Sequence, residues 1–95
     1  MRTSEELDRM HEAVVARFPG GLTGKQFMLV TLESADEDGR VYPPSIAGGL
    51  MAQTSLLMSM CWYEDVIAPG WHRHDQPMWW KITQKGRDWL AAQTA

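Results

Sequence analysis

Two histidines, His72 and His74, stand two positions apart beside Asp75 in the segment WHRHD. Imidazole nitrogens and a carboxylate are zinc ligands, but this segment lacks the further ligands that a closed tetrahedral site needs. A nucleophilic pair of Cys61 with His11 has even less support, because nothing in the sequence places them together and no oxyanion motif accompanies them. We therefore expect no metal, no cofactor and no enzymatic activity.

Length and composition limit what the chain can build. Its 95 residues, 44% apolar and 22% charged, allow one domain with one core and argue against wholesale disorder. The single cysteine rules out an internal disulfide, and the charged N-terminal segment has no apolar run of signal-peptide length. No segment reaches membrane-spanning length either. We expect a single cytoplasmic domain over residues 1–95, with no membrane partner.

The charges are unevenly distributed along the chain, whose net charge is −3. Eight of the twelve acidic residues precede residue 39, whereas the remainder of the chain is close to neutral. The acidic segment 33–38 is most simply a solvated turn.

Capping motifs mark the first two expected helices. The sequences TSEE at residues 3–6 and TGKQ at residues 23–26 are both capping boxes, which satisfy the first free backbone donors of a helix. Apolar residues follow the first at helical spacing, so we expect one helix over about 3–18 and a second over about 23–34. A short strand is expected at Val41 and Tyr42, because residues before proline are pushed out of the helical region.

The second half of the chain predicts two helices, a strand and a closing helix. Gly48 and Gly49 weaken a single helix in the long apolar segment from Ser45, so two helices with a tight turn are favoured. After a break at 68–70 and an expected loop at 71–77, the sequence MWWKI alternates as a hairpin strand does. This alternation directs Met78, Trp80 and Ile82 inward and Trp79 and Lys81 outward. Thr83 can cap a last helix, whose Trp89 and Leu90 return to the core.

This order of elements resembles the winged helix-turn-helix family, an α+β fold with a helical core and a small β-hairpin wing. Apolar residues match six offsets of the family's signature when counted from Pro43, namely Ile46, Ala47, Leu50, Ala52, Leu57 and Met60. Met51 stands where the family usually has a turn glycine. The sequence KITQKGRDWL also resembles the end of a wing and the helix that follows. The resemblance implies a helix-turn-helix at about 44–66, a wing at about 67–83 and a closing helix at about 84–93.

The resemblance implies a transcription regulator that binds double-stranded DNA sequence-specifically, as a homodimer joined through its first or last helix. Glutamine pairs with adenine, serine and threonine bond base edges or phosphate, and methionine touches the thymine methyl. No lysine or arginine occurs between Val41 and His72, so phosphate contacts must come from flanking basic residues, with Lys25, Arg40 and Arg87 as additional sources. The implied DNA-binding residues are Gln53, Thr54, Ser55, Met58, Ser59, Arg73, Lys81 and Lys85.

An alternative function uses the same fold without DNA. The acidic residues in the part of the chain before residue 39 would repel DNA, and aromatic side chains anchor protein interfaces. The chain would then be a protein-interaction module, such as a small phage-type inhibitor or adaptor, with contacts through Met58, Trp62, Trp71 and Trp79. The sequence also leaves open whether Met58 is exposed or belongs to the core.

Overall fold

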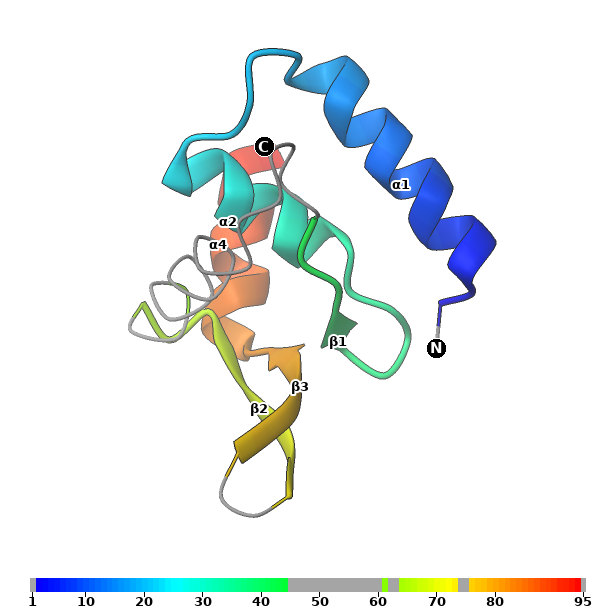
Figure 1. Cartoon of the computed structure of the whole chain (residues 1–95). Helices are drawn as coiled ribbons and strands as arrows, with labels where there is room; N and C mark the ends of the chain where they lie inside the picture. Colours follow the sequence, from blue (N-terminus) through cyan, green and yellow to red (C-terminus); the bar gives the residue numbers. More distant parts are fainter. Residues whose placement is uncertain (1, 45–60, 62–63, 74–75, 95) are drawn as a thin grey trace.

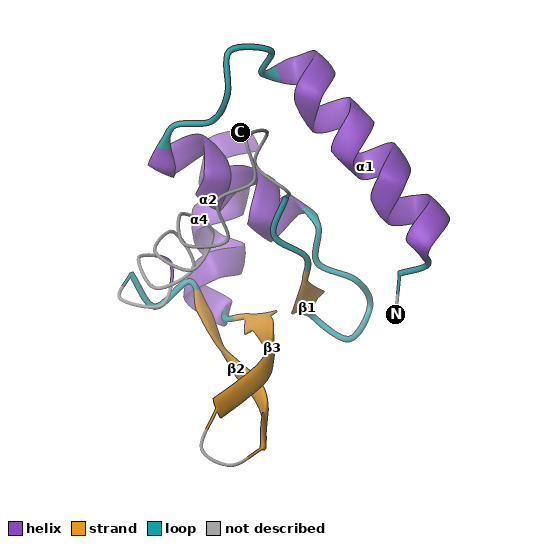
Figure 2. Ribbon diagram, in the orientation of Figure 1, coloured by secondary structure: helices purple, strands orange, loops and turns teal. Residues whose placement is uncertain are grey.

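The computed structural model describes residues 2–44, 61, 64–73 and 76–94, with the backbone alone at 71–73, 76–78 and 94. The described elements run in the order α1 (Ser4–Arg17), α2 (Gly24–Glu33), β1 (Arg40–Val41), β2 (Ile67–Arg73), β3 (Gln76–Ile82) and α4 (Gln84–Thr94). Three helices and a three-stranded antiparallel sheet confirm the predicted α+β class for this part of the chain (Figures 1 and 2). The predicted helix-turn-helix at about 44–66 lies almost wholly outside the described residues.

Local capping explains where the helices begin. At α2, Thr23 Oγ1 accepts a hydrogen bond from the Gln26 amide (3.2 Å), and Gln26 Oε1 accepts one from the Thr23 amide (3.0 Å). Thr3 caps α1 by accepting from the amide of Glu6. The three predicted helices that fall within the described residues, at about 3–18, 23–34 and 84–93, are therefore confirmed in type and in place, because their start signals lie within one turn of sequence.

The sheet has the strand order β1-β3-β2. Strand β1 begins one residue earlier than predicted, and the predicted loop at 71–77 is wrong, because β2 continues to Arg73 and β3 starts at Gln76. Proline at 77 does not prevent this pairing. β1 ends opposite Trp80, so among the described strands the part of β3 before that residue pairs with β2 alone, and an edge strand tolerates proline.

The core lies between α2, α4 and one face of the sheet. Phe27 and Leu32 of α2 are fully buried, and the sheet contributes Val41, Ile67 and Ile82. Trp80, Trp89 and Leu90 are partly buried and pack against this core, as the sequence predicts. Figure 1 shows α2 and α4 together, with the β2–β3 hairpin projecting from them.

Helix α1 stands apart from this body (Figure 1) and contributes no buried residue. None of the helices that the structure describes combines the length and the apolar character needed to cross a bilayer.

Candidate nucleic-acid interface

The outer face of the sheet carries a pair of positive charges. Arg40 and Lys81 are direct partners in the β1–β3 register, so their side chains leave the same face of the sheet. Lys81 is exposed, and Arg40 is half-buried. Trp79, two residues before Lys81 on the same strand, shares that face. The predicted outward direction of Trp79 and Lys81 is therefore confirmed.

Arginine and aromatic side chains are stacked on this face. The guanidinium carbon of Arg40 lies 6.0 Å from the ring centroid of Trp79 and 5.1 Å from that of Tyr42. Both separations lie near the distance at which a cation is attracted to the face of an aromatic ring. The rings thus limit the positions that the Arg40 guanidinium adopts.

A local irregularity of β2 positions the indole of Trp79. The register shifts between Pro69 and Trp71, and Gly70 lies at that point. A Cβ atom on Gly70 would overlap the Trp79 ring, so the indole lies directly against the backbone of β2. Trp79 is consequently half-buried by its own hairpin.

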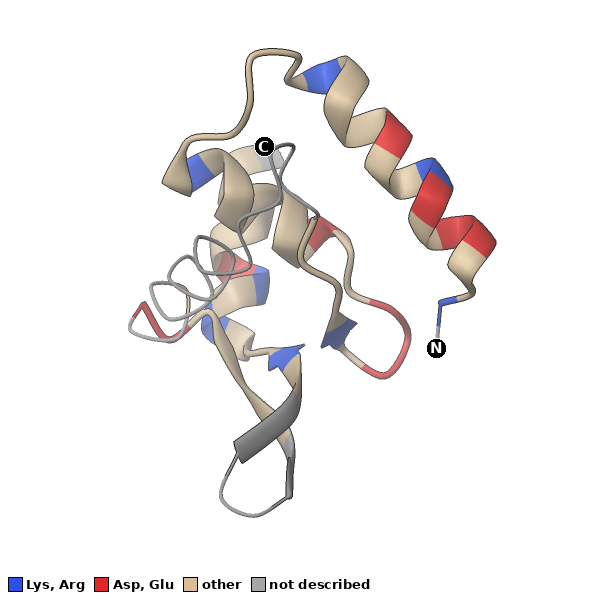
Figure 3. Cartoon of the chain, in the orientation of Figure 1, with Lys and Arg blue, Asp and Glu red and all other residues tan. Residues whose placement is uncertain are grey.

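The start of α4 brings two further basic residues to the base of the hairpin. Thr83 Oγ1 accepts from the amide of Gly86 (3.0 Å) and so caps the helix whose first turns carry Lys85 and Arg87, both exposed. The Arg87 guanidinium reaches the turn at Gly39, which needs glycine because its φ is +82°. Figure 3 shows Lys and Arg positions of β1, β3 and early α4 gathered around the base of the hairpin. We call Arg40, Lys81, Lys85 and Arg87 the basic cluster.

An acidic turn borders the basic cluster. Asp36 accepts hydrogen bonds from the Tyr42 hydroxyl (2.9 Å) and from the amides of Asp38 (2.9 Å) and Arg40 (3.1 Å). Desolvation alone would raise the pKa of the Asp36 carboxyl, but these hydrogen bonds bring it below its ordinary value. Asp36 therefore stays negatively charged at neutral pH and fixes the turn that leads into β1.

The structure describes only part of the predicted site. Gln53, Thr54, Ser55, Met58 and Ser59 lie outside the described residues, as does Trp62. Arg73 lies in strand β2 and not in the predicted loop. For Trp71, His72, Arg73 and Met78 the structure describes the backbone alone. The described residues contain no cluster of histidine, cysteine and carboxylate side chains able to hold a metal ion.

Lys81 and Lys85 are exposed, as a phosphate contact requires. The sequence identified Arg40 only as a positive charge near the end of the second helix. Its position opposite Lys81 depends on the pairing of two residues that are 41 positions apart along the chain, for which the sequence carries no local signal.

No protein-family model matches the chain, and comparisons with curated proteins and with solved structures found no match either.

Proposed function

We propose that this protein is a transcription regulator of the winged helix-turn-helix type, which binds double-stranded DNA and uses the basic cluster to contact phosphates. The observation that carries the proposal is the paired placement of Arg40 and Lys81 on the outer face of the sheet, at the base of a projecting hairpin. Lysine and arginine at such a position neutralise DNA phosphates and release counterions.

The topology of the sheet supports the proposal. β1 precedes the segment of residues 45–60, and it pairs with the second strand of the hairpin that follows that segment. A winged-helix sheet combines a short early strand with a later hairpin in this way. The 25 residues between β1 and β2 give enough chain for two short helices and a turn.

Specificity comes from a different part of the chain in this proposal. Gln53, Thr54, Ser55, Met58 and Ser59 contact base edges, and Arg73 of the hairpin contacts the flanking backbone. Four basic side chains give a modest electrostatic footprint, so a homodimer joined through α1 or α4 would bind more strongly than a single copy.

Replacing Lys81 by glutamine tests the phosphate contact. Lys81→Gln removes one exposed positive charge from the sheet without disturbing the core, so it should weaken binding to cognate and scrambled duplexes alike. Fluorescence anisotropy titrations at low salt would measure the loss. Arg9→Gln is the matched control, because it removes the same charge from an exposed i,i+4 pair on α1. Equal affinities for Lys81→Gln and Arg9→Gln would remove the outer face of the sheet from the interface.

A protein-interaction module is the second candidate function. It is favoured by the stacking of Arg40 on Trp79, because arginine and tryptophan are the residue types that most often dominate protein interfaces. Trp79→Ala should then abolish capture of a specific partner from lysate, whereas Lys81→Gln should change it little. Enrichment of a DNA sequence by the parent protein, with no such partner, would reject this candidate.

A further inference from the structure

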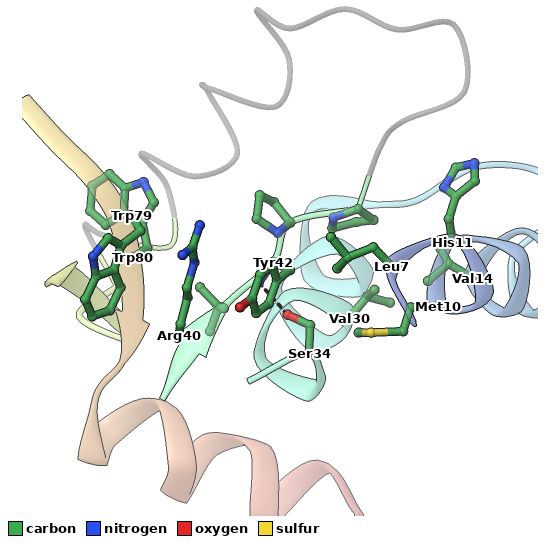
Figure 4. A pocket seen from close by; sticks show the side chains of 13 residues that line it. Leu7, Met10, His11, Val14, Val30, Ser34, Arg40, Tyr42, Trp79 and Trp80 are labelled. Atoms are coloured by element: carbon green, nitrogen blue, oxygen red, sulfur yellow. Dashed lines mark hydrogen bonds between the residues drawn. The ribbon is translucent and has the colours of Figure 1, made fainter. Parts of the chain in front are cut away.

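A groove lies between α1 and the body of the molecule, by which we mean α2, α4 and the sheet. It consists of two hollows, of about 350 Å³ and about 170 Å³, and Met10, Val14 and Val30 line both of them. Figure 4 shows Leu7, Met10 and Val14 of α1 on one side of the larger hollow, with β1 and β3 across from them. Because α1 buries none of its residues, its apolar face is not packed closely against the helix that it faces.

The chain between α1 and α2 has the features of a pivot. Gly20 and Gly21 are surrounded by open space, since a Cβ atom on either would meet nothing within 4 Å. Gly21 also has a φ of +95°, which glycine adopts readily. Leu22, by contrast, packs against the core. Rotation at residues 18–21 would therefore move α1 and leave the core in place.

Three hydrogen bonds of Arg2 hold the end of α1 that is far from this pivot. Arg2 donates from Nε to the carbonyl of Ser34 (2.8 Å) and from Nη2 to that of Ala35 (3.2 Å), just beyond the end of α2. Its backbone amide donates to the Tyr42 hydroxyl (3.1 Å), which itself donates to Asp36 (2.9 Å). We call the three bonds made by Arg2 the latch.

An ion pair between Arg17 and Glu33 (2.7 Å) attaches the other end of α1, next to the pivot. The helix has 14 residues and is about 21 Å long, so a contact at its last residue does little to fix the position of its first. The two side chains are also 49% and 35% exposed, and exposed ion pairs stabilise little. The latch therefore decides whether α1 stays against the body.

We propose that α1 is a hinged arm, which swings on residues 18–21 between the latched state of Figure 1 and a released state in which the bonds of Arg2 are broken. Release uncovers the apolar side chains of both walls together, because Leu7, Met10 and Val14 move away from Val30. A helix of this length is marginal on its own, so the released arm also exchanges its amide protons faster. This device does not depend on the proposed function.

Distances between spin labels on the full chain test the arm. Labels at Asp8→Cys on α1 and Asp38→Cys on the body report on the latched end, and both native side chains are exposed. Cys61 is fully buried, so it should stay unlabelled in the native protein. Double electron–electron resonance should show one main distance when Arg2 is present. Arg2→Met should enlarge a population at longer distance about tenfold or more, through loss of charge-assisted hydrogen bonds.

A second variant weakens the latch from the body. Tyr42→Phe removes the acceptor of the Arg2 amide and keeps the aromatic ring, so it should enlarge the same population. Arg9→Met is the matched control, because it removes an exposed arginine of α1 that has no part in the latch, and it should leave the distances unchanged. A label pair within the body, Asp38→Cys with Gln93→Cys, should keep its distance in every variant.

Distances in Arg2→Met and Tyr42→Phe that both match those of the unsubstituted protein would overturn the hinged arm. Equal lengthening of the pair within the body would overturn it as well, because the whole fold would then have loosened. Lengthening in Arg2→Met alone would support the arm and confine the latch to the two carbonyls.

Discussion

At the scale of single residues, close contacts with glycine determine how the hairpin and the last helix meet. Gly86 lies in the first turn of α4, where a Cβ atom would overlap the carbonyl oxygen of Val66. That oxygen accepts a hydrogen bond from the Thr83 amide at 3.0 Å, so it cannot move without loosening the junction of strand and helix. Gly70 has a similar role beneath Trp79, where a Cβ atom would overlap the indole ring.

Gly86→Ala should therefore destabilise the protein although alanine favours helices. Overpacking against backbone costs about 1–3 kcal/mol, which exceeds the gain of about 1 kcal/mol or less from helix propensity. Thermal unfolding followed by circular dichroism would measure the change. Gly20→Ala serves as the control, because nothing lies within 4 Å of a Cβ at that position. A melting temperature for Gly86→Ala equal to that of Gly20→Ala would contradict the packing described at Val66.

Cys61 is a fully buried thiol in the core. Burial raises its pKa to about 11, since a thiolate would lose its solvation there. The folded pKa is above that of the unfolded chain, so the stability gained from the neutral thiol is complete below about pH 9 and is lost toward pH 11.

We expect Cys61 to react with iodoacetamide at pH 8 only in denaturant, as mass spectrometry of timed samples would reveal. Rapid labelling of the native protein would contradict its burial.

At the scale of elements, α1 is the least firmly attached of the three described helices, because it buries no residue and depends on polar contacts more than on packing. Arg2 joins it to the carbonyls of Ser34 and Ala35 and, through its own amide, to the Tyr42 hydroxyl at 3.1 Å. Charged hydrogen bonds of this kind each contribute about 1.5–3 kcal/mol.

Arg2→Met should speed amide hydrogen exchange in α1 roughly tenfold or more while exchange in α2 stays unchanged. Arg9→Met, which removes only an exposed pair with Glu5, should leave exchange in both helices close to that of the parent. If both variants exchanged alike in α1, the attachment of the helix would have to come from its apolar face.

At the scale of the whole molecule, α1, α2, α4 and the inward face of β3 could be predicted from the sequence, whereas the candidate site could be predicted only in part. Capping at Thr3, Thr23 and Thr83 is local, and the alternation in MWWKI directs Ile82 inward whatever its partners are. The full length of the hairpin was not predicted, because a proline at position 77 argues against a strand. Proline is tolerated in a strand at the edge of a sheet, and the sequence alone does not show that this part of β3 lies at an edge. The strand partner of Lys81 follows from the pairing of distant segments, which no local pattern encodes.

The salt dependence of DNA binding tests the central proposal most directly. The parent protein would be used to enrich a duplex from a random library at low salt, and affinity would then be measured across salt concentrations. The logarithm of affinity should fall linearly with that of salt, and the slope should be shallower by roughly 1.8 in the Lys81→Gln/Lys85→Gln double variant, about 0.9 for each lost phosphate contact. A library that yields no enriched duplex, or a double variant with the slope of the parent, would contradict the assignment of the basic cluster to DNA.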